Sequence, residues 1–403
     1  MLYKLTLENF GAIREQQTLD LSISGKVEEE ADRQLRHGDI RTPRVSVIVG
    51  ANASGKTTVL KAISFLTDFV TRSAINPQGR HLNVLPYWGP GARDEDTRLS
   101  VEFYADWLAP SAPVPFRYTL DITAGRQPWE RWMKREQLDF KPSSHWASLI
   151  DATPDGALLR RDFQRLAGAV PATALARRNV SVISLLLNFA PQDPLVASLA
   201  RTLSSVFTNL VAGQRDQAKF EAVAEVYANQ PESLAALNTM VRRADLGITR
   251  VTTADYPSSE PEKKTWVLFF EHGGLGGSLP AIHESRGTMN FVSIFPTLHS
   301  TLSAGGLALM DELDSDLHPE LLKEIVGWFN DPEMNKLGAQ LITTCNNPAI
   351  LDYLRKDEIF FASKNDQGAT SVYGLKDLPK VRRDANFQRE YLAGRYGAIP
   401  HIG

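Results

Sequence analysis

The chain is 403 residues long, 43% hydrophobic and 23% charged, with a formal net charge of −3. This length allows a large core and predicts a main body with a second lobe, and the composition is ordinary for a soluble globular protein. A uniformly basic nucleic-acid-binding protein is excluded, so any basic surface must be local.

Cysteine content and hydropathy indicate the cellular compartment in which we expect the protein. The single cysteine, Cys345, excludes an internal disulfide and suits the cytosol. Residues 1–6 lack the long apolar segment of a signal peptide, and no uninterrupted stretch approaches about 18 apolar residues. We therefore expect a cytoplasmic protein that makes no contact with a membrane.

The first fifty residues lead into a phosphate-binding loop. Alternating apolar and polar residues predict strands at 2–7 and 17–22, and many charges predict a solvated loop over 26–42. A β-branched run at 44–49 predicts a buried strand, and the apolar spacing of 59–70 predicts a helix.

Between this strand and this helix lies Gly50-Ala51-Asn52-Ala53-Ser54-Gly55-Lys56-Thr57, which fits the P-loop pattern G-x-x-x-x-G-K-[ST]. Such a loop directs backbone N–H groups at phosphate oxygens, its lysine reaches the β and γ phosphates, and its threonine hydroxyl reaches Mg²⁺. The alternative is an ordinary strand–helix turn. We expect ATP to be bound by Gly50, Asn52, Ala53, Ser54, Gly55, Lys56, Thr57 and Thr58.

The middle of the chain looks like an insertion. Strands are expected at 99–106 and 116–123, and a long, mainly helical region follows. We divide the chain into an N-terminal ATPase lobe (1–124), an inserted, mainly helical lobe (125–245) and a C-terminal ATPase lobe (246–403).

Strand signals return at 247–252 and 265–270, and a helix at 288–303 leads into an apolar run that ends in two acids, Asp311 and Glu312. Two adjacent carboxylates after a buried strand are costly unless a metal or hydrogen-bond donors compensate them. We expect Asp311 to hold Mg²⁺ together with Thr57, and Glu312 to orient or deprotonate the attacking water. The alternative is a helix N-cap pair.

Two further segments resemble ABC-type ATPases of the SMC/RecF kind. His283-Glu284-Ser285-Arg286-Gly287-Thr288 is similar to their signature motif, and Asp314-Ser315-Asp316-Leu317-His318-Pro319 is similar to their crossover loop. The resemblance implies that Ser285 and Gly287 of one protomer meet the γ-phosphate held by the other. The alternative, if the resemblance is set aside, is that residues 283–288 simply cap a helix.

Gln340-Leu341-Ile342-Thr343-Thr344-Cys345-Asn346-Asn347-Pro348 resembles the switch strand of the same family, with Asn346 in place of the histidine that senses the γ-phosphate. A neutral amide can donate a hydrogen bond but supplies neither a cation nor a proton shuttle. We assign Asn346 to the catalytic group and expect slow hydrolysis. The alternative is that Asn346 and Asn347 simply begin a loop.

The segments 353–361 and 391–400 resemble AAA/ABC-type ATP-binding proteins of bacterial anti-phage defence, which are related to the OLD-like nucleases. The resemblance implies an α/β P-loop NTPase head of the ABC type, with a mixed sheet and the inserted helical lobe. It also implies ATP and Mg²⁺ as cofactors, a homodimer or higher oligomer of dimers, and a separately encoded effector such as a TOPRIM or HNH nuclease. A phage component or DNA is a further candidate partner.

The resemblance thus implies an ATP-hydrolysing sensor or scaffold of anti-phage defence that controls this effector, and two other functions stay open. One is a RecF/SMC-like DNA-repair ATPase that clamps DNA, and the other is a nearly inactive nucleotide-binding scaffold. The glutamine of the family's Q-loop has two candidates, Gln78 and Gln137, neither in a good context.

Overall fold

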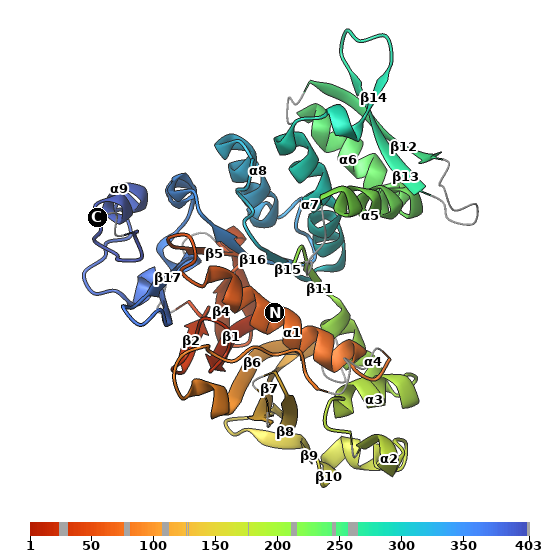
Figure 1. The fold of residues 1–403 in the computed structure, drawn as a ribbon, viewed down its shortest axis with the longest axis vertical. Helices are drawn as coiled ribbons and strands as arrows, with labels where there is room; N and C mark the ends of the chain where they lie inside the picture. Colours follow the sequence, from red (N-terminus) through yellow and green to blue (C-terminus); the bar gives the residue numbers. More distant parts are fainter. Residues whose placement is uncertain are drawn as a thin grey trace.

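The computed structural model describes residues 1–23, 31–75, 81–106, 113–125, 127, 129–175, 177–210, 216–243, 247–256 and 265–400. Its centre is a mixed sheet of six strands in the order β11-β15-β16-β5-β17-β18 (Figure 1). The strands are β5 (Val45–Val49), β11 (Val206–Thr208), β15 (Leu307–Met310), β16 (Gln340–Cys345), β17 (Ile359–Lys364) and β18 (Thr370–Gly374). The first five run parallel and β18 runs antiparallel to β17.

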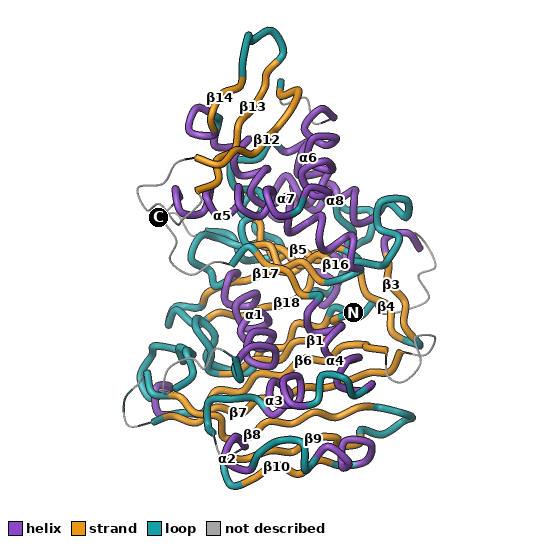
Figure 2. Tube along the Cα trace, turned by 90° about the vertical axis from the view of Figure 1, so that its right-hand side faces the viewer, coloured by secondary structure: helices purple, strands orange, loops and turns teal. Residues whose placement is uncertain are grey.

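Helices cover both faces of this sheet, which explains why every residue of β5, β15 and β16 is buried. Side chains alternate between faces, so Ile48 joins the core shared with α1 (Lys56–Arg72), whereas Val47 joins the core shared with α7 (Arg286–Ala304) and α8 (Pro319–Asn330). Figure 2 shows these layers, with α1 between the central sheet and a second sheet.

The second sheet is antiparallel and has seven strands in the order β10-β9-β8-β7-β6-β1-β2. They are β1 (Leu2–Glu8), β2 (Gln17–Asp20), β6 (Thr97–Asp106), β7 (Pro113–Ala124), β8 (Arg131–Phe140), β9 (Ala147–Thr153) and β10 (Gly156–Leu159). The face of this sheet that points away from α1 carries cross-strand ion pairs, among them Arg98–Asp121 at 2.7 Å and Arg135–Asp151 at 2.8 Å.

The expectation of a mainly helical lobe over 125–245 is wrong for its first part, because β8, β9 and β10 extend the antiparallel sheet. Strand β8 buries Arg131 and Glu136 together with Met133 and Leu138, so charged residues interrupt the apolar alternation that marks a strand. Helices follow only after this sheet. They are η3 (Arg161–Leu166), α2 (Ala172–Leu175), α3 (Val182–Phe189), α4 (Pro194–Ser204), α5 (Asp216–Asn229) and α6 (Pro231–Arg243).

A third sheet forms an arm at the top of Figure 1, with α5 and α6 packed against it. It contains β12 (Ile248–Tyr256), β13 (Thr265–His272) and β14 (Ser278–Pro280), and a glycine-rich turn at 273–277 joins the last two. The segment 281–285, which contains the single-turn η4 (Ala281–His283), then leads from β14 into α7.

The remaining elements are short. The segment 31–43, most of which lies in the solvated loop expected over 26–42, contains η1 (Ala31–Arg33) and a hairpin of β3 (Gln34–His37) and β4 (Ile40–Pro43). The others are η2 (Ala92–Asp94), η5 (Pro348–Tyr353), η6 (Lys356–Glu358), η7 (Leu375–Asp377) and α9 (Phe387–Leu392).

In the described part of the chain, no single helix has the length and hydropathy needed to cross a membrane; α3 and α4 meet that test only as a pair, bent by 118° at the break between them.

Candidate nucleotide-binding site

The P-loop connects β5 to α1, and its two glycines are required by close packing. A Cβ on Gly50 would lie 2.3 Å from the carbonyl oxygen of Ala362 in β17. A Cβ on Gly55 would lie 2.2 Å from Oγ1 of Thr370 in β18, and Gly55 also has φ of +96°. A larger residue at Gly50 would displace the backbone of β17, and one at Gly55 would displace the Thr370 side chain and adopt an unfavourable backbone conformation, so both strands restrict the loop.

The lysine of the loop is buried and faces inward. Nζ of Lys56 donates to the carbonyl oxygens of Gly50 at 2.8 Å and Ala51 at 2.9 Å. Burial lowers the pKa of this ammonium, and the negative charges of Glu312, Asp314 and Asp311 oppose that shift. Lys56 therefore lies within reach of both the loop and the acids that follow β15.

The other loop residues differ in their exposure. Asn52 and Ala53 are exposed, and Ala53 has φ of +60°. The hydroxyl of Ser54 is buried and has no hydrogen-bond partner within the described ranges. The backbone N–H of Thr58 donates to Gly55 O at 3.0 Å, which starts the first turn of α1. An unpartnered buried hydroxyl within a phosphate-binding loop fits a ligand that supplies oxygen acceptors.

The two acids directly follow β15. Oδ1 of Asp311 accepts hydrogen bonds from Oγ1 of Thr57 at 3.0 Å and from Oγ1 of Thr344 at 2.7 Å. The same Thr344 oxygen accepts from the backbone N–H of Glu312 at 2.7 Å. The next helix, α8, has His318 as its N-cap. The alternative in which Asp311 and Glu312 form an N-cap pair is therefore excluded.

The donor set around Asp311 suits Mg²⁺. Asp311 supplies a carboxylate oxygen and Thr57 a hydroxyl, and Mg²⁺ is commonly held by one or two protein oxygens with phosphates and waters completing the coordination. Over the described ranges, no group of three or more His, Cys, Asp or Glu side chains could hold a metal without such additional ligands. The site thus fits a metal that arrives with a nucleotide.

Glu312 and Asn346 lie next to each other. Glu312 has φ of +50°, and its Oε1 accepts a hydrogen bond from Nδ2 of Asn346 at 3.4 Å. Left-handed backbone is uncommon for glutamate and persists where the surroundings hold it in place. Asn346 therefore lies beside the carboxylate that is expected to act on the attacking water.

Asp314 connects the crossover loop to the end of the switch strand. Its Oδ2 accepts from the backbone N–H groups of Asn346 at 2.9 Å and Asn347 at 2.7 Å, and its Oδ1 is buried without a partner in the described residues. Burial, reinforced by the charge of Asp314, raises the pKa of Cys345 far above its usual range. Cys345 is thus a buried thiol and not a reactive thiolate.

The expected signature lies at the start of α7. The Ser285 hydroxyl accepts from the backbone N–H of Thr288 at 3.1 Å, so Ser285 caps the helix. A Cβ on Gly287 would lie 2.6 Å from the carbonyl oxygen of Asp316 in the crossover loop. These contacts of Ser285 and Gly287 are to α7 and to the crossover loop, not to the P-loop.

Besides Thr344, one further residue of the site was missed from the sequence. Asn209, directly after β11, exchanges two hydrogen bonds with the backbone of Asp311: its Nδ2 donates to Asp311 O at 2.9 Å, and its Oδ1 accepts from Asp311 N at 2.7 Å. It lies beside the acid that is expected to hold Mg²⁺. Gln137 lies instead in β8, and Gln78 lies outside the described residues. The only local signal was a polar residue following the short apolar run of β11.

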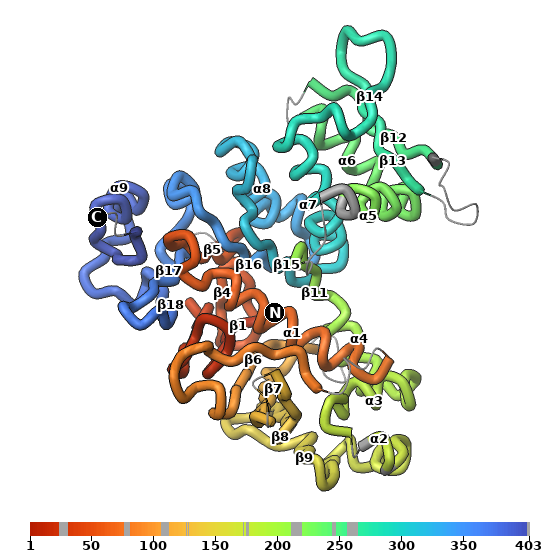
Figure 3. The backbone as a smooth tube through the Cα atoms, viewed as in Figure 1, coloured from red at the N-terminus to blue at the C-terminus, as the bar shows by residue number. Residues whose placement is uncertain are grey.

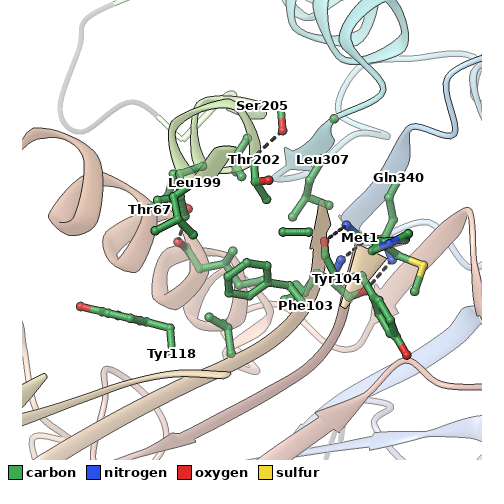
Figure 4. Close-up of a pocket in the computed structure, with 18 of the residues that line it drawn as sticks. Met1, Thr67, Phe103, Tyr104, Tyr118, Leu199, Thr202, Ser205, Leu307 and Gln340 are labelled. Carbon is green, nitrogen blue, oxygen red and sulfur yellow. Dashed lines mark hydrogen bonds between the residues drawn. The ribbon is translucent and has the colours of Figure 1, made fainter. Parts of the chain in front are cut away.

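A separate cavity lies away from these residues, at the amino ends of β15 and β16 (Figure 4). Its volume is about 250 Å³, and Thr67, Thr202, Leu307 and Gln340 are among its lining residues. The Thr67 and Thr202 hydroxyls donate within their own helices, and the Gln340 amide exchanges two hydrogen bonds with the backbone of Leu2. This cavity does not contain the P-loop or the acids.

The P-loop, the paired acids and the parallel sheet define a P-loop ATPase domain. Two family profiles match the chain: one described as "AAA domain" matches residues 4–96, and one described as "AAA domain, putative AbiEii toxin, Type IV TA system" matches residues 176–352. The first range includes the P-loop and the second includes the acids. The chain is therefore similar to AAA-type ATPase domains over both the segment with the P-loop and the segment with the acids.

Similar solved structures are heads of SMC proteins. One, bound to the C-winged helix domain of ScpA, is 14% identical, with 92% of this chain and 97% of that chain covered and a TM-score of 0.43. The SMC head of Thermotoga maritima is 14% identical, with coverage of 93% and 98% and a TM-score of 0.41. A third, from Pyrococcus furiosus and bound to the C-terminal domain of ScpA, is 13% identical, with coverage of 93% and 97% and a TM-score of 0.43. No curated protein matches the chain.

Proposed function

We propose that this protein binds and slowly hydrolyses Mg²⁺-ATP. In this proposal Lys56 contacts the β and γ phosphates, Thr57 and Asp311 hold the metal, and Glu312 orients or deprotonates the attacking water. Bound Mg²⁺ would neutralise charge that develops on the phosphate oxygens. The observation that carries the proposal is the Asp311 carboxylate, shared by the hydroxyls of Thr57 and Thr344 directly beside Glu312.

The experiment is calorimetry of Mg²⁺-ATP binding combined with steady-state phosphate release. Lys56→Ala removes the ammonium that meets the phosphates and should weaken binding at least about tenfold, equivalent to about 1.4 kcal/mol. Glu312→Gln keeps the shape of the side chain but cannot act as a base, so turnover should fall by a factor on the order of 10² while binding survives. Unchanged affinity in Lys56→Ala, or unchanged turnover in Glu312→Gln, contradicts the assignment.

The second part of the proposal is a pair of heads that encloses two nucleotides. Ser285 and Gly287 of one protomer would complete the site formed by the P-loop of the other. The support is that both residues lie at a helix N-terminus beside the crossover loop, where the helix dipole favours an anion.

At the cellular scale, we propose a sensor or scaffold in anti-phage defence that controls a separately encoded effector, a nuclease of the TOPRIM or HNH type. The support for a defence role is the match of residues 176–352 to the family profile whose description includes "putative AbiEii toxin". The test is phage plating on cells that express the chain with its neighbouring genes. Protection that is lost in Lys56→Ala supports the role, and plating equal to that of cells without the genes contradicts it.

A second candidate is a nucleotide-binding scaffold with almost no turnover. It is favoured by one observation, the neutral amide of Asn346 beside the carboxylate of Glu312. Both candidate functions predict that the protein binds ATP, but only the first predicts measurable ATP hydrolysis.

A further inference from the structure

Residues 387–398 pack against the P-loop from the side of β17 and β18. They comprise α9 and the turn that follows it (Figure 3). The backbone N–H of Ala51, at the second position of the P-loop, donates to the carbonyl oxygen of Ala398 at 3.1 Å. This N–H is therefore bonded within the protein and does not point freely toward a phosphate.

The carbonyl group of Ala398 is itself held in place. Its oxygen also accepts a hydrogen bond from the Tyr391 hydroxyl at 3.0 Å, so both of its lone pairs are used. Gly397 and Ala398 both have left-handed backbone, with φ of +71° and +57°. A Cβ on Gly397 would lie 2.8 Å from the hydroxyl of Tyr373, which donates to Tyr396 O at 2.7 Å.

An aromatic cluster joins this turn to the sheet. Phe361 of β17 stacks on Tyr391 with ring centroids 5.5 Å apart, and lies 5.8 Å from Tyr396 and 5.7 Å from Tyr373. The next residue of β17 is Ala362, whose carbonyl oxygen leaves no room for a Cβ on Gly50. The strand that borders the P-loop thus also anchors Tyr391.

The P-loop is held at three points by this part of the chain. Ala362 limits Gly50, Ala398 accepts from Ala51, and the Thr370 hydroxyl donates to Ser54 O at 2.8 Å. From the inner side, Nζ of Lys56 donates to the carbonyls of Gly50 and Ala51.

We propose that residues 387–398 form a positioning element of the nucleotide site, with Tyr391 as its central positioning residue. This inference rests on the proposed ATP binding and extends it. Tyr391 orients the Ala398 carbonyl, which fixes the Ala51 peptide so that Lys56 and the later N–H groups of the loop face the phosphates. A loop held in its binding shape before the ligand arrives loses less entropy on binding.

The test is Tyr391→Phe, which removes the hydroxyl and keeps the ring that stacks on Phe361. The Kd and the KM for Mg²⁺-ATP should rise about three- to tenfold, the range for one lost hydrogen bond. The kcat should stay at the wild-type value, because Asp311 and Glu312 are held by Thr344 and Asn209.

The matched control is Tyr227→Phe. Tyr227 is also buried, and its hydroxyl donates to a backbone carbonyl, that of Val292, at 2.8 Å in the packing of α5 on α7. Both variants should lower the melting temperature, but only Tyr391→Phe should change the Kd. A merely structural role for Tyr391 predicts the same Kd in both.

A second variant, Gly397→Ala, disturbs the same carbonyl by placing a methyl group against Tyr373, and should also raise the Kd. Wild-type Kd in both Tyr391→Phe and Gly397→Ala, or an equal rise in Tyr227→Phe, overturns this inference alone. Absence of Mg²⁺-ATP binding by the wild-type protein overturns the proposed function, and this inference with it.

Discussion

At the scale of single residues, the Thr344 hydroxyl lies between the two acids. It donates to the carboxylate of Asp311 and accepts from the backbone N–H of Glu312, which lies in a left-handed conformation. One hydroxyl therefore orients the expected metal ligand and the backbone of the expected base. Its neighbour Thr343 donates to the backbone carbonyl of Met310 and contacts neither carboxylate.

Replacing Thr344 tests this arrangement. Thr344→Val keeps the shape but leaves the partly buried Glu312 N–H without its acceptor, at a cost of about 1 kcal/mol in the free energy of unfolding. We expect phosphate release to fall by about tenfold or more, because Glu312 and Asp311 lose their relative position. Thr344→Ser should restore turnover. Thr343→Val should lose stability and keep turnover; equal turnover loss in both valine variants would argue against a specific role for Thr344.

Asn346 allows a second test at this scale. The amide donates to Glu312 at 3.4 Å, and a charge-assisted bond from an imidazolium is about twice as strong as a neutral one. Asn346→His should leave the affinity for Mg²⁺-ATP nearly unchanged and raise steady-state phosphate release. Wild-type turnover already near tens per second would mean that another residue fills this role and that the slow-ATPase proposal is wrong.

The sequence predicts a site residue when its partners are close in the chain. Gly50, Gly55 and Lys56 act within one loop, so a local pattern identifies them. Asn209 and Thr344 act on Asp311 from positions about 100 and 33 residues away, and no local pattern marks such pairs.

At the scale of elements, the buried strands β5 and β15 were predicted from their mainly apolar runs, and β16 from its resemblance to the switch strand. Strand β8 was missed because its buried face includes two charged side chains. Arg131 donates to the carbonyls of Glu95 and Arg93, while Glu136 accepts from the Ser181 hydroxyl and the Val182 N–H. Tertiary partners thus replace the apolar contacts that sequence patterns detect.

Glu136 gives an element-scale prediction, because it fastens the start of α3 to β8. Burial raises the pKa of this carboxyl above its ordinary value of about 4.5, and hydrogen bonds from Ser181, Val182 and Tyr118 partly oppose the rise. The folded state therefore holds the proton more tightly than the unfolded state. The resulting stabilisation is fully present below the ordinary pKa and is lost as the pH rises through the raised value.

Glu136→Gln removes this titration. The melting temperature of the variant relative to wild type should increase as the pH is raised from about 4 toward neutrality, as measured by circular dichroism at a series of pH values. The control is Glu15→Gln, since the Glu15 side chain is 81% exposed and should give no such trend. A constant difference between Glu136→Gln and wild type would contradict the predicted linkage.

At the scale of the whole molecule, the two halves of the proposed site lie in different parts of the chain. The P-loop follows β5, whereas the signature begins α7 beside the arm of α5, α6 and the third sheet (Figure 1). Ser285 contacts its own helix and Gly287 lies against the crossover loop. Each protomer therefore carries both a P-loop and the proposed signature, but these signature residues make their contacts away from the P-loop of the same protomer. A two-fold pair of protomers would bring each P-loop to the partner's signature.

Mixing two defective proteins tests this pairing. Gly287 is a poor position to alter, because any Cβ would displace the crossover loop of the same protomer. Ser285→Asp is better: aspartate still caps α7 and adds a negative charge that repels a γ-phosphate, while Ser285→Asn keeps the cap without the charge.

Alone, Lys56→Ala and Ser285→Asp should both lose turnover, and Ser285→Asn should retain most of it. A heterodimer of the two defective proteins keeps one site with an intact P-loop and an intact signature, so an equal mixture should recover about a quarter of wild-type phosphate release if protomers exchange freely. If each protomer hydrolyses ATP alone, the mixture will show no recovery, and Ser285 will have only its capping role in α7.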